Sequence, residues 1–137
     1  MSFTTLDPAF LVSPQIHPGD VAAAAAAGVT AIVNNRPDGE EPGQPASADI
    51  EAAARAAGLA YHHLPFTDLP ALDQVQAIAR LLDEPDVRLL AFCRVGTRSA
   101  RLWALAEARR GGDGPTILAQ AEGAGYDLSP LRRLLLR

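Results

Sequence analysis

The stretch that decides the fold is LLAFCRVGTRSA, residues 89–100. Its apolar first part predicts a buried strand over 87–92, and its last residues begin a segment whose apolar positions have helical spacing. Between them lies a short polar loop that holds Cys93, the chain's one cysteine. The pattern therefore predicts a strand, a tight loop and a helix that starts near Ser99. In parallel sheets ligands bind beyond the carboxyl ends of the strands, where this loop would lie.

The residues of this loop also predict a reactive site. Backbone N–H groups of residues 94–98 can converge on the Cys93 sulfur, and the N-terminus of the following helix adds partial positive charge. We therefore expect Cys93 to be a thiolate and a nucleophile. Arg98 lies where its planar fork can grip an anionic group delivered to the sulfur. A buried, unreactive cysteine is the alternative, but two neighbouring arginines and a serine are poor core material.

The other loop residues are candidates for binding the substrate. Arg94, Val95 and Thr97 would contribute backbone N–H groups to an anion cradle. Gly96 permits a backbone conformation, or a close approach of a ligand, that a Cβ would obstruct. Ser99 can cap the helix or donate a hydrogen bond to the sulfur.

Length and composition indicate a single domain over residues 1–137, since 137 residues with 48% apolar content suffice for one packed core. The net charge of -4 argues against a surface that binds nucleic acid or membranes. One cysteine excludes an intramolecular disulfide and a multi-cysteine metal site, and we expect no metal or other cofactor. We expect a cytoplasmic protein, because the sequence has no signal peptide and no apolar span of about 18 residues.

Strands alternate with helices along the rest of the chain. Apolar runs predict further strands near 10–12, 30–34 and 59–64. Helical spacing, caps and breakers predict helices over 19–27, 48–57, 71–83, 99–110 and 115–124, with a last short one from Ser129. This order predicts an α/β fold with a mainly parallel sheet flanked by helices on both faces.

A long loop over 35–46 is rich in proline, glycine and charge. It follows the strand predicted over 30–34, so it opens at the same edge of the sheet as Cys93. Arg36, at the start of this loop, is a candidate substrate-binding residue. For the acidic residues of the loop, a place facing the site and a solvated turn are equally open: these are Asp38, Glu40 and Glu41.

Four motifs resemble those of one known family. They are SPQI at 13–16, NRPDGE at 35–40, CRVGTRSA at 93–100 with LWAL at 102–105, and AGYDL at 124–128. The family is the bacterial phosphatase-like domain found beside beta-lactamase-like hydrolases, and the resemblance covers nearly the whole chain. It implies a dual-specificity-phosphatase-like fold with Cys93 as nucleophile and Arg98 as the anion-binding arginine.

The resemblance leaves the reaction open. Cysteine phosphatases generally place five residues between nucleophile and arginine and a histidine before the cysteine, whereas this chain has four residues and Phe92. The shorter loop resembles that of single-domain rhodaneses, where a ring of amides holds a persulfide sulfur. Loop length thus predicts a sulfurtransferase that forms a persulfide on Cys93, from thiosulfate, a small persulfide or a protein donor, with a protein as possible acceptor. The alternatives are a phosphatase that hydrolyses a phosphate ester through a phosphocysteine, and a non-catalytic redox or interaction module.

The two enzyme functions differ in their need for an acid. A phosphatase needs a carboxylic acid to protonate the leaving oxygen. Asp68 follows the strand predicted over 59–64 and is the candidate general acid, with a turn or helix-capping aspartate as the alternative. Asp73 is a weaker candidate because it begins a helix. Sulfur transfer from an anionic donor needs no such acid.

Overall fold

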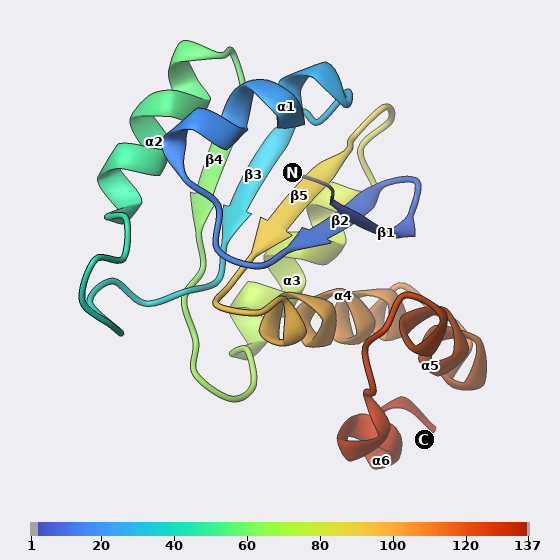
Figure 1. Cartoon of the computed structure of the whole chain (residues 1–137). Coiled ribbons are helices and arrows are strands. Elements are labelled where there is room, and N and C mark those ends of the chain that lie inside the picture. Colours follow the sequence, from blue (N-terminus) through green and yellow to red (C-terminus); the bar gives the residue numbers. More distant parts are fainter. Residues whose placement is uncertain (1–2, 137) are drawn as a thin grey trace.

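The protein folds around a five-stranded sheet (Figure 1), as seen in a computed structural model that describes residues 3–136. The strands run in the order β1-β2-β5-β3-β4 across the sheet. All neighbours are parallel except β1, which pairs antiparallel with β2. This confirms the mainly parallel sheet predicted from the sequence. The strands are β1 Thr4–Asp7, β2 Phe10–Ser13, β3 Ala31–Asn34, β4 Ala60–His63 and β5 Leu89–Phe92.

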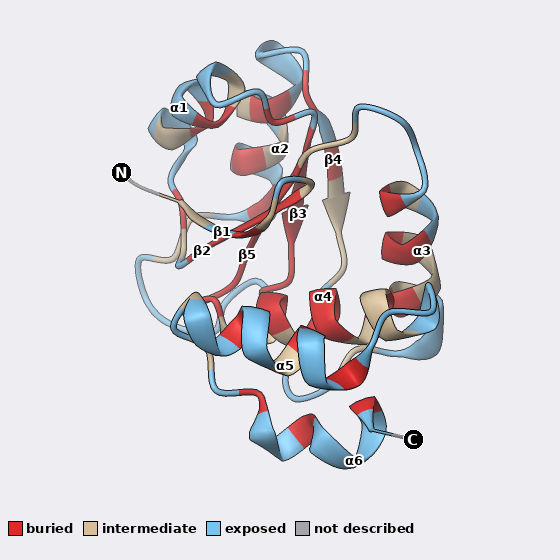
Figure 2. Ribbon diagram, turned by 90° about the vertical axis from the view of Figure 1, so that its right-hand side faces the viewer, coloured by how far each residue is buried: buried red, intermediate tan, exposed pale blue. Residues whose placement is uncertain are grey.

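Helices cover both faces of the sheet (Figure 2). Alternate side chains of each strand point to opposite faces, so Leu90 and Phe92 pack under α1 and α2, while Leu89 and Ala91 pack under α3 and α4. The helices are α1 Val21–Ala26, α2 Ser47–Ala56, α3 Leu72–Leu82, α4 Thr97–Arg109, α5 Gly114–Gly123 and α6 Arg132–Leu135, with 3₁₀ turns at Pro18–Asp20 and Ser129–Leu131. None of these helices is long and apolar enough to span a membrane, as far as the described residues go.

Two local predictions differ from the structure. The strand β1 is not expected from its sequence, because its polar threonines carry no apolar run; it forms by pairing antiparallel with β2. The start of α2 also differs: the sequence predicts the helix from residue 48, whereas it begins at Ser47, after the N-cap residue Ala46, and the Ser47 N–H donates to Asp38 Oδ1 at 2.8 Å. Asp38, an acidic loop residue left open above, therefore caps a helix.

The carboxyl ends of the parallel strands meet at one edge of the sheet. The last residue of β5, Phe92, lies beside Ser13 of β2 on one side and Asn34 of β3 on the other. The loops that follow these strands therefore converge, as the sequence predicted. The long loop over 35–46 and the segment over 64–71 both approach the start of α4, which brings residues far apart in the sequence to Cys93 (Figure 1).

Candidate active site

Cys93 directly follows β5 and lies near the N-terminus of α4. The Gly96 N–H donates a hydrogen bond to its sulfur, with 3.0 Å between nitrogen and Sγ. Gly96 adopts φ 97°, a left-handed conformation that turns the chain sharply, and α4 begins at the next residue, Thr97. The helix thus starts two residues before the predicted Ser99. Cys93 has no exposed surface, with 0% relative exposure, so a substrate reaches its sulfur only if neighbouring groups move.

Arg98 lies in the first turn of α4 and is 14% exposed. Its Nη1 and Nη2 donate to the two carboxylate oxygens of Glu40 at 3.0 and 2.9 Å, and Nη1 also donates to the Phe66 carbonyl at 3.0 Å. The hydrogen bond to Glu40 raises the pKa of Arg98, and the electrostatic interaction with Cys93 adds to the effect. Arg98 is therefore a fixed cation beside the candidate nucleophile.

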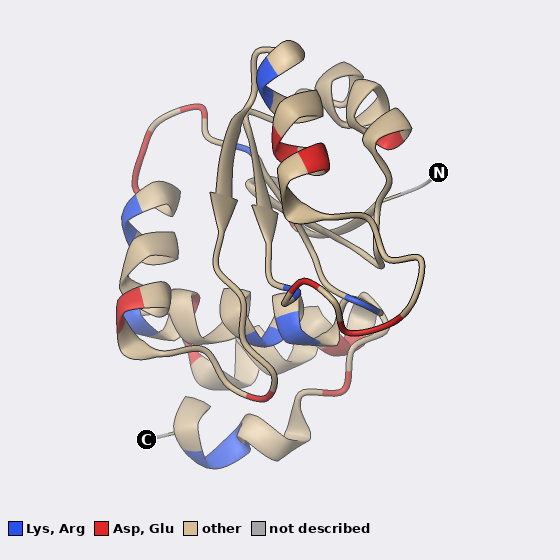
Figure 3. Cartoon of the chain, turned by 90° about the vertical axis from the view of Figure 1, so that its left-hand side faces the viewer, with Lys and Arg blue, Asp and Glu red and all other residues tan. Residues whose placement is uncertain are grey.

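Arg36 does not face solvent, because its side chain is 2% exposed. Its Nε donates to Glu40 at 2.8 Å, its Nη2 to Glu41 at 2.8 Å and its Nη1 to Gln15 at 3.0 Å. Burial opposes the charged form, but the hydrogen bonds that Arg36 donates to Glu41 and Glu40, together with the negative charges of these two carboxylates, outweigh it and raise the pKa of Arg36. The structure thus places Arg36 behind the site, where it holds Glu40 rather than a ligand. Figure 3 shows these acidic residues beside the arginines at the start of α4.

Ser99 is buried and does not bond the sulfur. Its hydroxyl donates to Asn35 Oδ1 at 2.8 Å, and the Asn35 side chain in turn donates to the Leu64 carbonyl at 3.0 Å. The Asn35 N–H donates to the Phe92 carbonyl at the end of β5. Ser99 therefore ties the first turn of α4 to the loops that follow β3 and β4, which is a supporting role.

The rim of the loop is open to solvent. Val95 is 57% exposed, and Arg94 is exposed beside it. The Arg94 Nε lies 3.8 Å from Glu41, so the two form a loose ion pair. Thr97 is half-buried at the first position of α4. These three residues surround the approach to Cys93, where their backbone or side chains can meet a ligand.

Asp68 lies on the outer rim of the site. Its carboxylate is 87% exposed and accepts a hydrogen bond from Arg101 Nη1 at 3.2 Å. Arg101 lies one turn further along α4 than Arg98, and the Phe66 carbonyl binds Arg98 from the same loop. This loop therefore crosses the first turns of α4 and holds Asp68 near the entrance without a hydrogen bond to Cys93. Asp73 instead accepts from the Gln74 N–H at the start of α3.

Tyr126 is a site residue to which the sequence assigned no role. A Cβ at Gly96 would collide with the Tyr126 hydroxyl, so this phenol packs directly on the cysteine loop. Burial raises the pKa of Tyr126, and the electrostatic interaction with Cys93 contributes. The motif at 124–128 contains Tyr126, but only the folded chain brings it to Cys93. Trp103, by contrast, is 1% exposed and donates to Asp7, so it is a core residue.

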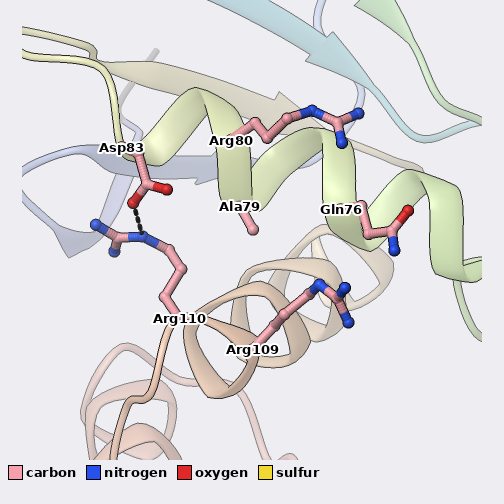
Figure 4. Close-up of a pocket in the computed structure, with 6 residues that line it drawn as sticks. All are labelled: Gln76, Ala79, Arg80, Asp83, Arg109 and Arg110. Atoms are coloured by element: carbon pink, nitrogen blue, oxygen red, sulfur yellow. Dashed lines mark hydrogen bonds and ion pairs between the residues drawn. The ribbon is translucent and has the colours of Figure 1, made fainter.

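A large cavity of about 410 Å³ lies elsewhere, between the far ends of α3 and α4 (Figure 4). Arg109 and Arg110 line it at the last turn of α4, about 18 Å along that helix from the cysteine loop. It is therefore separate from the candidate active site. Within residues 3–136 no cluster of histidine, cysteine, aspartate and glutamate side chains could hold a metal ion.

Comparison with known proteins identifies the family of the chain. Residues 2–110 match the family described as "Beta-lactamase hydrolase-like protein, phosphatase-like domain". The chain belongs to this family. A beta-lactamase hydrolase-like protein of Xylella fastidiosa is 44% identical over 82 residues, 58% of this chain and 19% of that protein. One from Agrobacterium fabrum is 37% identical over 94 residues, 67% of this chain and 22% of that protein. The phosphatase-like domain thus spans about a fifth of these relatives.

Solved structures agree with the family. A proposed phosphatase from Neisseria meningitidis is 34% identical, with a TM-score of 0.82 over 98% of this chain and 96% of that chain. Tk-PTP in its active form gives a TM-score of 0.74 at 20% identity, and covers 98% of this chain and 92% of its own. PTPMT1 gives 0.71 at 16% identity, over 98% and 91%. The fold is therefore that of the protein tyrosine and dual-specificity phosphatases, and these relatives favour the phosphatase alternative over the sulfurtransferase that loop length predicts.

Proposed function

We propose that this phosphatase-like domain is a phosphomonoesterase in which Cys93 is the nucleophile. The observation that carries the proposal is the Cys93 sulfur at the end of β5, with the Gly96 N–H bonded to it and Arg98 in the first turn of the helix that follows. Family membership and the phosphatase fold support it. The substrate class is a phosphate ester, and the reaction uses no cofactor.

The first step transfers the phosphoryl group to sulfur. The Cys93 thiolate attacks phosphorus, an S–P bond forms, and the P–O bond to the leaving group breaks. Arg98 and the backbone N–H groups of residues 94–98 hold the nonbridging oxygens, whose charge must be balanced in the transition state. Asp68 donates a proton to the leaving oxygen, which departs as an alcohol or phenol.

The second step regenerates the enzyme. Water attacks phosphorus, the S–P bond breaks, and the Cys93 thiolate and inorganic phosphate are released. The Asp68 carboxylate left by the first step accepts the proton of the water. Because Asp68 is held to Arg101 at the rim and exposed, its loop must move inward for both transfers. Cys93 is itself buried, so binding of the phosphoryl group and this loop movement are expected to occur together.

A sulfurtransferase remains a second candidate because of one observation, the four-residue spacing between Cys93 and Arg98. In that reaction the thiolate attacks the sulfane sulfur of thiosulfate, an S–S bond forms on Cys93, and sulfite leaves with the electron pair of the broken bond. A thiol acceptor or cyanide then takes the sulfane sulfur and restores the thiolate. No general acid is needed, so Asp68 has no role in this chemistry.

Two assays on one preparation distinguish the candidates: hydrolysis of p-nitrophenyl phosphate, and sulfur transfer from thiosulfate to cyanide. For a phosphatase we expect Cys93-dependent hydrolysis that vanadate inhibits, with Asp68→Asn lowering it by about 10²–10⁴. The matched control is Asp73→Asn, another exposed aspartate near the start of α3, which should keep activity within about twofold.

The opposite pattern would favour sulfur transfer. Thiosulfate turnover that Asp68→Asn leaves within a few-fold, with an adduct of about 32 Da on Cys93, identifies a persulfide carrier and overturns the phosphatase proposal. If Cys93→Ser kept both activities, both enzymatic functions would be contradicted, because each depends on the thiolate.

A further inference from the structure

The position of Arg98 depends on the long loop over 35–46, and Glu40 is the residue that makes the connection. Glu40 accepts from Nη1 and Nη2 of Arg98 at 3.0 and 2.9 Å through its two carboxylate oxygens. This is the end-on fork of the guanidinium, a strong and directional arrangement. The Phe66 carbonyl takes the second N–H of Nη1.

The remaining donors of Arg98 are free to bind a ligand. A guanidinium has five N–H groups, and Glu40 and Phe66 take three of them. The other two, on Nε and Nη2, point to the same side and form a second fork. Among the residues described, neither has a protein partner, and Nε is not sealed from solvent. A carboxylate that blocked the anion site would occupy this fork, so the observed contact orients Arg98 and leaves its binding edge open.

Glu40 is itself held on two sides. Its Oε1 accepts from Nε of the buried Arg36 at 2.8 Å, and its backbone N–H donates to the Gln44 side chain at 3.0 Å. The Gln44 amide donates to the Pro37 carbonyl at 2.8 Å, which closes the loop on itself. A carboxylate anchored in this way can fix a flexible arginine side chain that would otherwise lose rotamer freedom on binding a ligand.

We propose that Glu40 is a positioning residue that sets the orientation of Arg98, so that the Nε–Nη2 edge meets an anionic substrate above Cys93. Arg36 acts one step further back, because it holds Glu40. This inference rests on the proposed function for its physiological substrate, but the orientation of Arg98 toward an anion can be measured without turnover.

The test compares alkylation of Cys93 by iodoacetate and by iodoacetamide. Both reagents form the same S–C bond with loss of iodide, and both need the same movement to reach the buried sulfur. The ratio of the two rates therefore removes the cost of that movement, and a change in this ratio between variants reports a change in the attraction of the iodoacetate carboxylate to Arg98. We expect a ratio above one in the parent that falls at least about fivefold in Glu40→Gln. The kcat/KM for p-nitrophenyl phosphate should fall about tenfold in parallel.

Glu41→Gln is the matched control. Glu41 is the neighbouring glutamate on the same loop and contacts Arg36, but it makes no bond to Arg98. Its alkylation ratio should stay within about twofold of the parent. Thermal unfolding shows whether each variant is folded. If Glu40→Gln is not, Glu40→Asp takes its place, since the shorter side chain keeps the charge but draws the carboxylate back from Nη1 and Nη2 of Arg98.

The outcomes separate this inference from the proposed function. The inference is overturned if the alkylation ratio of the folded Glu40 variant equals that of Glu41→Gln. It is also overturned if the ratio rises, because a rise would mean that Glu40 competes with the ligand. A ratio lowered only by the Glu40 variants supports it, even if p-nitrophenyl phosphate is not hydrolysed, in which case the phosphatase proposal alone fails. A parent ratio of one that Arg98→Lys does not change overturns both.

Discussion

At its first turn α4 presents Arg98, which is 14% exposed and bound by Glu40 and the Phe66 carbonyl. At its last turn it presents Arg109 and Arg110, which lie on the surface beside the cavity of Figure 4. Arg109 makes no ion pair with any described residue, and Arg110 pairs with Asp83 and with Glu107, one turn earlier on its own helix.

The difference shows what distinguishes an arginine held in place to bind an anion from a cluster of arginines on the surface. Cations at a helix C-terminus are favoured by the helix dipole and remain hydrated, so they need no partner from elsewhere in the fold. Cations at a helix N-terminus oppose the dipole, and partial burial adds a desolvation cost. Arg98 lies in that position because a carboxylate from a loop far away in the sequence balances its charge. The two ends of α4 should therefore respond differently to the same substitution.

The largest contrast is expected between two glycines that flank α4. Gly96 and Gly111 have φ values of 97° and 93°, but a Cβ would meet the Tyr126 hydroxyl at Gly96 and open space at Gly111. Gly111→Ala should cost about 1–2 kcal/mol for the left-handed backbone alone. Gly96→Ala should cost about 2–5 kcal/mol, because overpacking adds to that strain. Urea unfolding measures both, and equal costs would mean that Tyr126 yields freely.

Replacing an arginine by alanine gives the next contrast. Arg36→Ala removes the buried partner of Glu40 and Glu41, which we expect to cost about 2–3 kcal/mol, less than a fully buried pair because both glutamates are partly exposed. Arg110→Ala breaks surface pairs and should cost less than about 1 kcal/mol. Chemical denaturation with fixed m-values checks the difference. A cost for Arg36→Ala below that for Arg110→Ala would show that burial of the arginine is not what the glutamates balance.

Replacing an arginine by lysine keeps the positive charge and tests whether catalysis needs the guanidinium group. Arg98→Lys should lower kcat/KM for a phosphate ester by at least tenfold, about 1.4 kcal/mol, because an ammonium group cannot replace a two-donor edge. Arg109→Lys at the other end of α4 should stay within about twofold. Steady-state kinetics at several ionic strengths decides this. If Arg98→Lys matched the parent, a point charge would suffice and the orientation of the guanidinium would be irrelevant.

The smallest effect is expected on the stability of the fold at low pH. The hydrogen bond from Arg98 lowers the pKa of the Glu40 carboxyl, with a further contribution from Arg36. The pair therefore stabilises the fold fully above about pH 4.5, the ordinary value, and its contribution is lost as the pH falls through the lower value of the folded state. We expect Glu40→Gln to be less stable than the parent at pH 7, by about 1 kcal/mol or less, and the gap to narrow below pH 4.5. Arg109→Lys, which keeps the pair, should follow the parent; a gap that stays constant down to pH 3 would argue against the pair.

Local sequence patterns predicted much of the fold. The apolar run before Cys93 and the helical spacing after it predicted β5 and α4, because burial of a strand and of one helix face leaves a periodic signature. The alternation of strands and helices predicted the parallel sheet and hence the edge at which Cys93 lies. Arg98 was found as a candidate because it is in the same short loop as Cys93.

Contacts between distant segments could not be predicted in this way. Glu40 and Arg98 are 58 positions apart, and nothing in the loop over 35–46 distinguishes a carboxylate that binds an arginine from one that meets water. The same limit applied to Arg36, which the sequence placed at the substrate and the structure places behind Glu40. Tyr126 lies beyond the segment that matches the family, and only packing of the chain after α5 against Gly96 brings it to the site.

The sequence by itself determined the four parallel strands of the sheet, the edge of the sheet where Cys93 lies and the identity of the candidate nucleophile, because each depends on patterns of a few neighbouring residues. Only the tertiary structure decided which carboxylate fixes Arg98 beside that nucleophile, and that Arg36 lies behind this carboxylate rather than at the substrate. The physical reason is that a buried charge is stabilised by whichever partner the fold brings within hydrogen-bond distance, and that distance is not encoded by separation along the chain.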